Sequence, residues 1–348
     1  MGMANLGNQL YTGETSLDFV GRRKRSYLVT GVVFLLSLVL LVVPGLTFGI
    51  EFEGGSEFRV SGGAAAGEST ATDAVEEVVP GTAPQVTTVG QGDVRVQTVE
   101  LDTAQLDEVR AALAEAYDVP VSDVTSTSIG PSWGANVTRQ ALTALLVFFV
   151  IVSVVLTVYF RAVAMAGAAM IALVHDLVVS AGIYALVGFE VTPATVIGFL
   201  TILGYSIYDT VVVFDKAREN TQAAFRDRDR TFAEAANLAI NQTVVRSVNT
   251  TVVAILPVAA ILFIGDFLLG AGTLRDISLA LFVGTIVGGA SSVFIATPLL
   301  VDLRRRDRAV RALDAEVAER RASAAETVSA GAAAPGGAGG ATAAGGTA

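Results

Sequence analysis

The chain has 348 residues, of which 52% are hydrophobic and only 16% are charged, whereas about one residue in four is charged in soluble domains. The absence of cysteine excludes disulfides, thiolate nucleophiles and cysteine-ligated metals, and a single histidine leaves too few ligands for a catalytic metal centre. The net charge of -10 argues against nucleic acid as a partner, because phosphates require a basic surface. The composition therefore predicts a membrane protein without a metal or thiol active site.

Six apolar segments are each long enough to cross a bilayer, which takes about 20 helical residues. We therefore expect a polytopic α-helical membrane protein with six transmembrane helices, at residues 26–46, 139–160, 164–187, 192–214, 247–266 and 276–301. The first segment follows a basic run, as in a signal peptide. Because its apolar core is too long for a cleaved signal, we expect it to remain as an anchor.

The basic residues predict the orientation, because positively charged loops stay in the cytoplasm. With residues 1–25 placed as a cytoplasmic N-terminus, all but five of the 23 lysines and arginines fall on the cytoplasmic side. The exceptions are Arg59, Arg95, Arg110, Arg139 and Arg275. An even number of spans then returns the C-terminus to the cytoplasm.

Residues 47–138 separate the first two spans, and we expect them to form an extracytoplasmic domain. Their pattern predicts four strands and two helices, in the order strand 57–60, helix 71–79, strand 85–89, strand 94–100, helix 103–116 and strand 121–129. This β-α-β-β-α-β order is typical of an α+β ferredoxin-like domain. Acidic residues outnumber basic ones there by fifteen to three, which indicates either a solvated surface or an attraction for basic chains.

The cytoplasmic segments after the fourth span are charged. Residues 215–246 alternate charged with apolar positions, which predicts an amphipathic loop of one or two interfacial helices. Residues 302–326 predict a charged helix. The Ala/Gly-rich residues 327–348 contain almost no core formers, and we expect a disordered tail.

Asp209 interrupts the fourth span, where an unpaired charge is costly. On a helix it shares a stripe with Tyr205 and Ser206, which lie four and three residues earlier, and this stripe is expected to face other helices. Desolvation and a nearby cation change the proton affinity of such a carboxyl group in opposite senses, and can poise it to take up and release a proton. The alternative is an aspartate that only bonds to a neighbouring helix.

Arg246 lies at the cytoplasmic edge of the fifth span, with Asn249 and Thr250 on the same helical face. If the fourth and fifth spans are antiparallel neighbours, Arg246 and Asp209 both lie in the cytoplasmic half of the bilayer and can form an ion pair. The alternative is an ordinary flanking arginine.

Two further patterns lie within spans. His175 and Asp176 occupy the third span, and because adjacent helical residues diverge by about 100°, they cannot both point at one neighbour. We expect a polar relay or a packing role, since the chain has no other histidine for a metal-dependent phosphohydrolase. Gly284 and Gly288 form a G-x-x-x-G pattern, which predicts close helix packing.

Several of these motifs together resemble the SecF family of bacterial protein-export proteins, which works with SecD and is related to the resistance–nodulation–division transporters. The residues that carry the resemblance are Phe48, Gly49, Glu51, Phe52, Gly54 and Gly55 on the periplasmic side of the first span, residues 130–132, His175 and Asp176, residues 204–215 and residues 218–220. The resemblance covers residues 17–306. Arginine outnumbers lysine by 21 to 2, which suggests an actinobacterial source.

The resemblance implies a multi-pass protein of the bacterial plasma membrane that promotes late steps of preprotein export through the SecYEG channel, with SecD and, indirectly, the ATPase SecA. It implies no cofactor except protons, supplied by the proton-motive force, and no enzymatic activity. The family's proton-relay aspartate and arginine map onto Asp209 and Arg246. Tyr208 stands where many members carry Asn, and Glu51 where Asp is common.

We expect protonation of Asp209 to weaken its pairing with Arg246, to let the fourth and fifth spans repack, and to swing the outer domain through the short connection at 48–55. Two alternatives stay open. One is a half-size exporter of small molecules or lipids from the same superfamily, which would usually have a larger outer domain and a second six-span half. The other is a scaffold for SecD without proton coupling.

Overall fold

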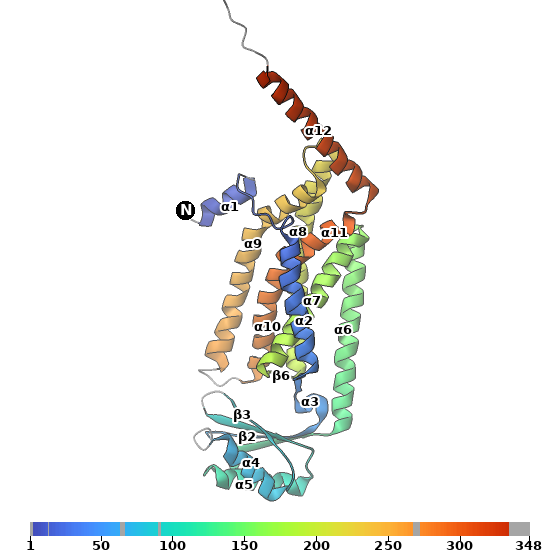
Figure 1. Cartoon of the computed structure of the whole chain (residues 1–348). Coiled ribbons are helices and arrows are strands. Elements are labelled where there is room, and N and C mark those ends of the chain that lie inside the picture. Colours follow the sequence, from blue (N-terminus) through green and yellow to red (C-terminus); the bar gives the residue numbers. More distant parts are fainter. Residues whose placement is uncertain (1–2, 13, 63–66, 90–91, 267–271, 334–348) are drawn as a thin grey trace, which may run out of the picture.

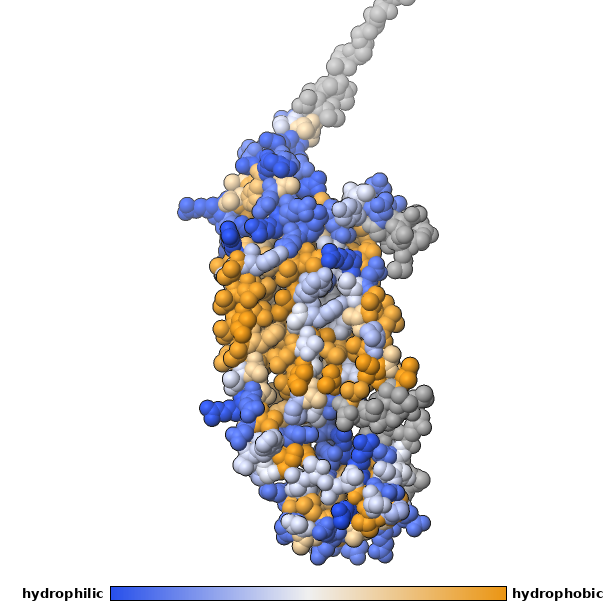
Figure 2. Space-filling model, turned by 180° about the vertical axis from the view of Figure 1, so that it is seen from behind, coloured by the Kyte–Doolittle hydropathy of each residue, from blue (hydrophilic) through white to orange (hydrophobic). Residues whose placement is uncertain are grey.

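The computed structural model describes residues 3–12, 14–62, 67–89, 92–266 and 272–333. Within these ranges, six helices are long and apolar enough to cross a membrane, as the sequence predicts. They form a bundle with an α+β domain at one end and further helices at the other (Figure 1). Figure 2 shows an apolar band across the rear face of the bundle, between two hydrophilic ends, as expected for a membrane-embedded body.

The membrane body is built from long helices, some with local π-helical turns. Their bounds are α2 Arg23–Val42, α6 Pro131–Phe160, α7 Val163–Val187, α8 Pro193–Asp227, α9 Phe232–Ala260 with the π-helical η3 Ile261–Asp266, and α10 Gly272–Ser291 with the π-helical η4 Ser292–Ala296 and α11 Thr297–Arg304. Helix α2 is peripheral, whereas α7, α8 and the α10–α11 segment are the most deeply buried of the six spans.

The segment at 215–246 differs from the expected interfacial loop. Helices α8 and α9 continue through it and are joined by residues 228–231 alone. Arg228 ends α8 in the left-handed conformation, at φ 55. Thr231 then caps α9, with its side chain accepting from the Glu234 amide and Glu234 bonding back to the Thr231 amide. The charged residues of this segment therefore lie on the last turns of α8 and the first turns of α9.

The first and last described helices of the chain pack on this α8–α9 hairpin. The N-terminal helix α1 Met3–Thr12, which the sequence did not predict, contacts α9. Asn237 of α9 accepts hydrogen bonds from the amides of Phe19 and Val20. Helix α12 Arg308–Ala333 buries Leu313 and Val317 in an apolar cluster that also contains Val20 and Phe232. It extends past residue 326, so that 327–333 are helical and not a disordered tail, since alanine-rich segments favour helix; residues 334–348 lie outside the described part.

The outer domain has a four-stranded antiparallel sheet in the order β3-β4-β2-β5. Its elements are β2 Gly55–Val60, α4 Glu68–Val78, β3 Gln85–Val89, β4 Asp93–Thr98, α5 Thr103–Ala116 and β5 Val124–Ile129. Alternate residues such as Phe58 and Val96 pack against Val109 and Leu113 of α5. Figure 1 places α4 and α5 on the side of the sheet away from the bundle, which leaves the other face of the sheet toward the membrane helices.

The connection from the first span to the outer domain is short and is paired with another loop. Strand β1 Thr47–Phe48 runs parallel to β6 Glu190–Val191, which lies between α7 and α8. Helix α3 Ile50–Glu53 follows and packs on the start of α6. A Cβ atom on Gly55, whose φ is +138, would lie 2.5 Å from the Thr98 carbonyl oxygen, so that only glycine fits there.

Candidate functional site

Asp209 lies in the middle of the bundle and is 4% exposed. Its carboxylate accepts one hydrogen bond from Ser247 Oγ of α9, at 2.8 Å, and another from Ser292 Oγ at the start of η4. Three elements therefore meet at this carboxylate, and both of its donors are neutral hydroxyl groups.

Small residues bring α8 and α10 close enough for these contacts. Gly198 of α8 packs against Ala280 of α10, and Gly284 and Gly288 of α10 face Ile202 and Ser206 of α8, so that a Cβ atom at any of the three glycines would lie less than 3.0 Å from a side chain. The G-x-x-x-G pattern is thus placed on the α8-facing side of α10. Its role is to let the backbones approach each other.

Asp176 of α7, which is 2% exposed, forms a second buried carboxylate centre. Its Oδ2 atom accepts from Ser206 Oγ at 2.6 Å and from Ser291 Oγ at 2.8 Å. His175 Nδ1 lies 3.3 Å from Oδ1. The His175 ring stacks on Phe34 of α2 while Asp176 points toward α8 and α10, so that the two neighbours face different helices.

Three of the four serines that bond these two carboxylates, Ser247, Ser291 and Ser292, were not predicted from the sequence, whereas Ser206 was. Ser291 and Ser292 are consecutive, at the junction of α10 and η4, and each bonds a different aspartate. The sequence pattern indicated only that Ser291 and Ser292 are small residues that follow Gly288. The signal available was a pair of hydroxyl side chains deep in an apolar span. Ser247 was equally hidden beside the more conspicuous Arg246.

Arg246 does not pair with Asp209 among the ion pairs of the described residues. It lies on the exposed side of α9, and its Nη2 atom is 3.3 Å from the hydroxyl of Tyr208. The reason is angular: Arg246 and Ser247, like Tyr208 and Asp209, are helical neighbours about 100° apart. Ser247 and Asp209 meet inside the bundle, and Arg246 and Tyr208 meet outside it.

The other polar residues predicted for this region are divided between the interior and the surface. The Tyr205 hydroxyl is buried and has no hydrogen-bond partner among the described residues. The Thr250 hydroxyl bonds to carbonyl groups of its own helix, at Arg246 and Ser247. Asn249 is exposed. The structure therefore brings Ser206 to the buried centre but not Asn249 or Thr250.

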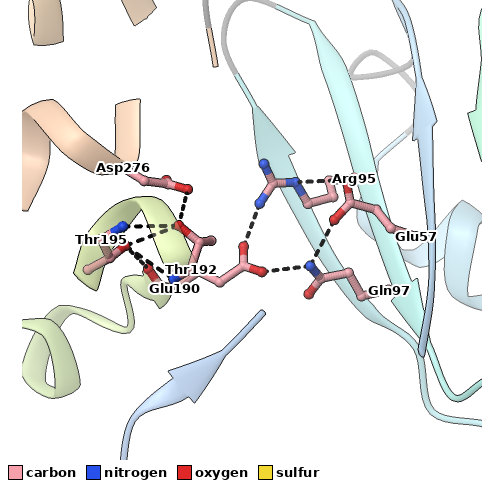
Figure 3. Close-up of polar contacts among 7 residues, drawn as sticks. All are labelled: Glu57, Arg95, Gln97, Glu190, Thr192, Thr195 and Asp276. Atoms are coloured by element: carbon pink, nitrogen blue, oxygen red, sulfur yellow. Dashed lines mark hydrogen bonds and ion pairs between the residues drawn. The ribbon is translucent and has the colours of Figure 1, made fainter. Parts of the chain in front are cut away.

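A third polar cluster joins the outer domain to the membrane body (Figure 3). Glu190 of β6 receives Arg95 Nη1 at 2.5 Å and Gln97 Nε2 at 2.7 Å, both from β4. Gln97 also donates to Glu57 of β2, at 3.0 Å. These β2 and β4 side chains project from the sheet face opposite α4 and α5. They therefore dock the sheet onto the α7–α8 connection.

The same connection is tied to the start of α10. Thr192 caps α8 and donates to Asp276 Oδ2 at 2.9 Å, while Thr195 donates to the Glu190 carbonyl oxygen at 3.3 Å. Figure 3 shows Glu190 between these threonines and the outer-domain residues. The α7–α8 connection thus links α8, α10 and the outer sheet.

Charge at this docking cluster is unbalanced. Burial by itself lowers the pKa of Arg95, but the carboxylates of Glu57, Glu190 and Asp276 outweigh burial and raise that pKa above its usual value. Burial raises the pKa of Glu51, and the carboxylates of Glu190 and Glu57 raise it further. Arg95 therefore pairs with the two carboxylates of Glu57 and Glu190 at this junction.

The periplasmic-side motif forms the rest of this junction. The Gly49 amide donates to the Val191 carbonyl oxygen at 3.0 Å, next to the β1–β6 pairing. The rings of Phe48 and Phe52 meet edge to face, with centroids 5.8 Å apart. Gly54, at φ +81, turns the chain from α3 into β2. The connection at 48–55, through which we expect the outer domain to swing, is therefore paired with the α7–α8 loop.

A metal centre finds no support in the described ranges, where no group of three or more His, Cys, Asp or Glu side chains is placed to hold an ion. Among the described residues, the bundle holds two buried carboxylates, Asp176 and Asp209, with serine hydroxyls as their donors and the His175 imidazole beside Asp176. Such groups exchange and transfer protons.

Comparisons with known proteins agree with this arrangement. Residues 109–306 match the family "Protein export membrane protein SecD/SecF, C-terminal", and residues 39–64 match the "SecD/SecF GG Motif" family. The chain is 46% identical to "Protein translocase subunit SecF" of Streptomyces coelicolor over 323 residues, which cover 93% of this chain and 86% of that protein. It is 42% identical to the protein of the same name from Mycobacterium tuberculosis (strain H37Rv), over 97% of this chain and 78% of that one.

A crystal structure of SecDF from Thermus thermophilus superposes with a TM-score of 0.75 at 31% identity and covers 84% of this chain. A second SecDF structure, in a super-membrane-facing form, gives a TM-score of 0.60 at 28% identity. This chain spans 39% and 40% of the two SecDF chains, and so corresponds to one part of a longer protein. With more than half of its residues matched by the family and close relatives along nearly its whole length, the chain belongs to the SecD/SecF family of protein-export membrane proteins.

Proposed function

We propose that this chain is the SecF-type subunit of a bacterial Sec protein translocase, and that with SecD it uses the proton-motive force to promote late steps of preprotein export through SecYEG, with SecA acting indirectly. The observation that carries the proposal is Asp209, a carboxylate buried in the membrane body and held only by serine hydroxyls in the described part of the chain. The role is that of an accessory subunit and not of an enzyme.

Neutral donors suit a proton-carrying site. An ionised Asp209 accepts from both serines, whereas a protonated Asp209 carries a proton of its own and must donate it to one of their oxygens. Each protonation state therefore prefers a different arrangement of α8, α9 and η4. Moving one elementary charge across 100 mV releases about 2.3 kcal/mol, which is enough to shift a two-state equilibrium tens-fold.

Arg246 enters this scheme in a different state of the protein. Because it is adjacent to Ser247 on α9, a rotation of α9 by about 100° would exchange the two beside Asp209. We assign Arg246 the role of the cation that favours release of the proton from Asp209. The Tyr208 hydroxyl holds its guanidinium group in the state described.

The exposed side of α8 and α9 supports a partner within the membrane. It displays Thr201, Gly204, Tyr208, Arg246 and Asn249, and Figure 2 shows a paler strip crossing the apolar band. Polar and charged residues are costly against lipid. A second membrane subunit would cover them, and the SecDF relatives, which contain an equivalent region within a longer chain, favour SecD as that subunit.

Movement at Asp209 reaches the outer domain through α8. Sixteen residues of helix, about 24 Å at 1.5 Å per residue, separate Asp209 from Pro193, directly after the connection that binds Arg95 and Gln97. We assign the outer domain to the ferredoxin-like class on its strand order β3-β4-β2-β5 and its two helices on one face. It would then move against the emerging preprotein on the extracytoplasmic side, with both chain termini in the cytoplasm.

The test is Asp209→Asn in the full chain, co-reconstituted with SecD, SecYEG and SecA. The variant is expected to assemble with SecD in normal amounts and to lose the increase in preprotein export caused by a proton gradient. Ser180→Ala is the matched control, because Ser180 is equally buried and its hydroxyl has no hydrogen-bond partner among the described residues. Full gradient-dependent export in Asp209→Asn would overturn the proposal and favour a scaffold for SecD without proton coupling.

A further inference from the structure

Asp176 has no part in the proton step proposed above, yet it is as deeply buried as Asp209. It lies on α7, which contributes no hydrogen bond to Asp209 among those of the described residues. The hydrogen bonds of Asp176 nevertheless end on the two helices, α8 and α10, that carry Asp209 and lead into its donor Ser292.

The positions of the bonded serines are specific. Ser206 is one helical turn before Asp209 on α8, and Ser291 immediately precedes Ser292. Asp176 therefore holds a polar side chain one helical turn from Asp209 on α8, and on α10 the residue next to the donor Ser292. The bond from Ser206, at 2.6 Å, is in the range of charge-assisted hydrogen bonds between a hydroxyl and a carboxylate, and the bond from Ser291 is 2.8 Å long.

The bond from Ser291 to Asp176 matters because the helix changes its winding between Ser291 and Ser292. Ser291 is the last residue of α10, and Ser292 is the first of the π-helical η4. Single π-helical turns in α-helices are rare and often lie at functional sites. A change from π-helical to α-helical winding alters the register of the side chains that follow, so the direction of Ser292 depends on what holds Ser291.

We propose that Asp176 is a positioning residue for the proton-carrying Asp209: by holding Ser206 and Ser291 it fixes the α10–η4 junction so that Ser292 donates to Asp209. The inference rests on the proposed function of Asp209. It assigns to the third span a role beyond helix packing, and it makes the state of Asp209 depend on α7.

The ionisable groups around the two carboxylates are few. His175 contacts Asp176 from α7 itself. Tyr205 and Tyr208 flank the same stretch of α8, and Arg246 contacts Tyr208 from α9. On η4 and the adjoining end of α10 the groups facing the carboxylates are the two serines. Loss of a positioned hydroxyl donor therefore acts directly on the proton affinity of Asp209.

The experiment measures the pH dependence of gradient-driven preprotein export in proteoliposomes that contain the full chain, SecD, SecYEG and SecA, at a constant gradient. Asp176→Asn and Ser291→Ala each weaken the hold on the α10–η4 junction. The carboxylate of Asp209 then loses stabilisation and takes up its proton at higher pH, and the midpoint is expected to rise by about one pH unit, the effect of losing one hydrogen bond to a charged group.

Ser180→Ala is the control, because it removes a buried hydroxyl one turn along α7 that bonds neither carboxylate; its midpoint is expected to match that of the unmodified protein. If Asp176→Asn fails to accumulate in the membrane, Ser291→Ala carries the test alone. A wild-type midpoint in whichever of these variants reaches the membrane overturns the inference.

Asp209→Asn, measured in parallel, separates the two hypotheses. If it retains gradient-driven export, the proposed function fails, and the positioning role fails with it. If it loses that export while Asp176→Asn and Ser291→Ala keep the wild-type midpoint, only the positioning role fails.

Discussion

The membrane interior and the junction with the α+β domain hold their carboxylates in opposite ways. In the interior, Asp209 and Asp176 are bonded by serine hydroxyls from neighbouring helices. At the junction, Glu190 and Glu57 are bonded by Arg95 and Gln97. A hydroxyl can donate to a carboxylate or accept from a carboxylic acid, whereas a guanidinium group can only donate. The interior arrangement permits a change of protonation, and the junction arrangement favours fixed charge.

This difference separates the two tasks that a proton-driven device requires. One region must change state when a proton arrives, and another must carry the resulting movement without coming apart. The α7–α8 connection joins them, because Glu190 binds the outer sheet while Thr192 and Thr195 begin the helix that bears Asp209.

The largest effect on the junction is expected from Arg95→Ala. The change leaves Glu190 and Glu57 without their arginine in a site where the Arg95 and Glu190 side chains are 20% and 17% exposed. We expect the outer domain to lose about 2 kcal/mol of docking free energy. Hydrogen exchange of the β1 and β6 amides measures this loss as faster exchange.

Arg59→Ala is the matched control, because Arg59 pairs with Asp93 within the outer domain and its side chain is 35% exposed. Its effect is expected to stay below about 1 kcal/mol. Equal effects of the two changes on β1 and β6 would contradict the docking role of Arg95.

A smaller effect is expected from Gly134→Ala, at the start of α6. Its Cβ would lie 2.4 Å from the Phe52 carbonyl oxygen, a backbone atom that cannot turn aside. We expect a loss of about 1–2 kcal/mol by overpacking, visible as a lower midpoint of thermal unfolding in detergent. Gly167→Ala on α7 has no atom within 4 Å of its new Cβ and is expected to be neutral or stabilising; if it lowered the midpoint as much, the close approach of α3 to α6 would not be the cause.

The smallest effect is expected from Glu51→Gln, through pH. Burial, with Glu190 and Glu57, raises the pKa of Glu51 in the folded protein. The folded state then binds this proton more tightly than the unfolded chain, so this carboxyl group makes the junction less stable as the pH rises from the unfolded pKa through the folded one. Glu51→Gln should flatten this decline in an unfolding series between pH 4 and pH 7. Glu53→Gln, which changes an exposed residue of the same helix, should leave the decline in stability unchanged. Identical curves for Glu51→Gln and the parent protein would refute the role of Glu51 in this pH dependence.

The sequence was sufficient to predict what depends on local pattern. Six apolar segments specify six spans, and the interruption of one of them by Asp209 predicts a residue turned inward, which is 4% exposed. Helical spacing also places Ser206 beside the buried centre. Each of these follows from the period of the α-helix and the cost of charge in hydrocarbon.

The partners of these residues were beyond the sequence, because they depend on helix rotation and on contacts between distant segments. Ser292 reaches Asp209 across 83 positions and Arg95 reaches Glu190 across 95. The rotation of α9 about its axis determines whether Ser247 or Arg246 faces Asp209. These two residues are adjacent, so about 100° of rotation separates them. The π-helical start of η4 has no signal of its own in the sequence.

The central claim is that Asp209 binds and releases a proton inside the working assembly. Infrared difference spectroscopy of the chain reconstituted with SecD and SecYEG, recorded through a pH titration, observes the protonated carboxyl group directly. The account predicts a carboxyl band that rises as the pH falls, disappears in Asp209→Asn and persists in Ser180→Ala. A spectrum in which Asp209→Asn removes no pH-dependent carboxyl band would contradict it.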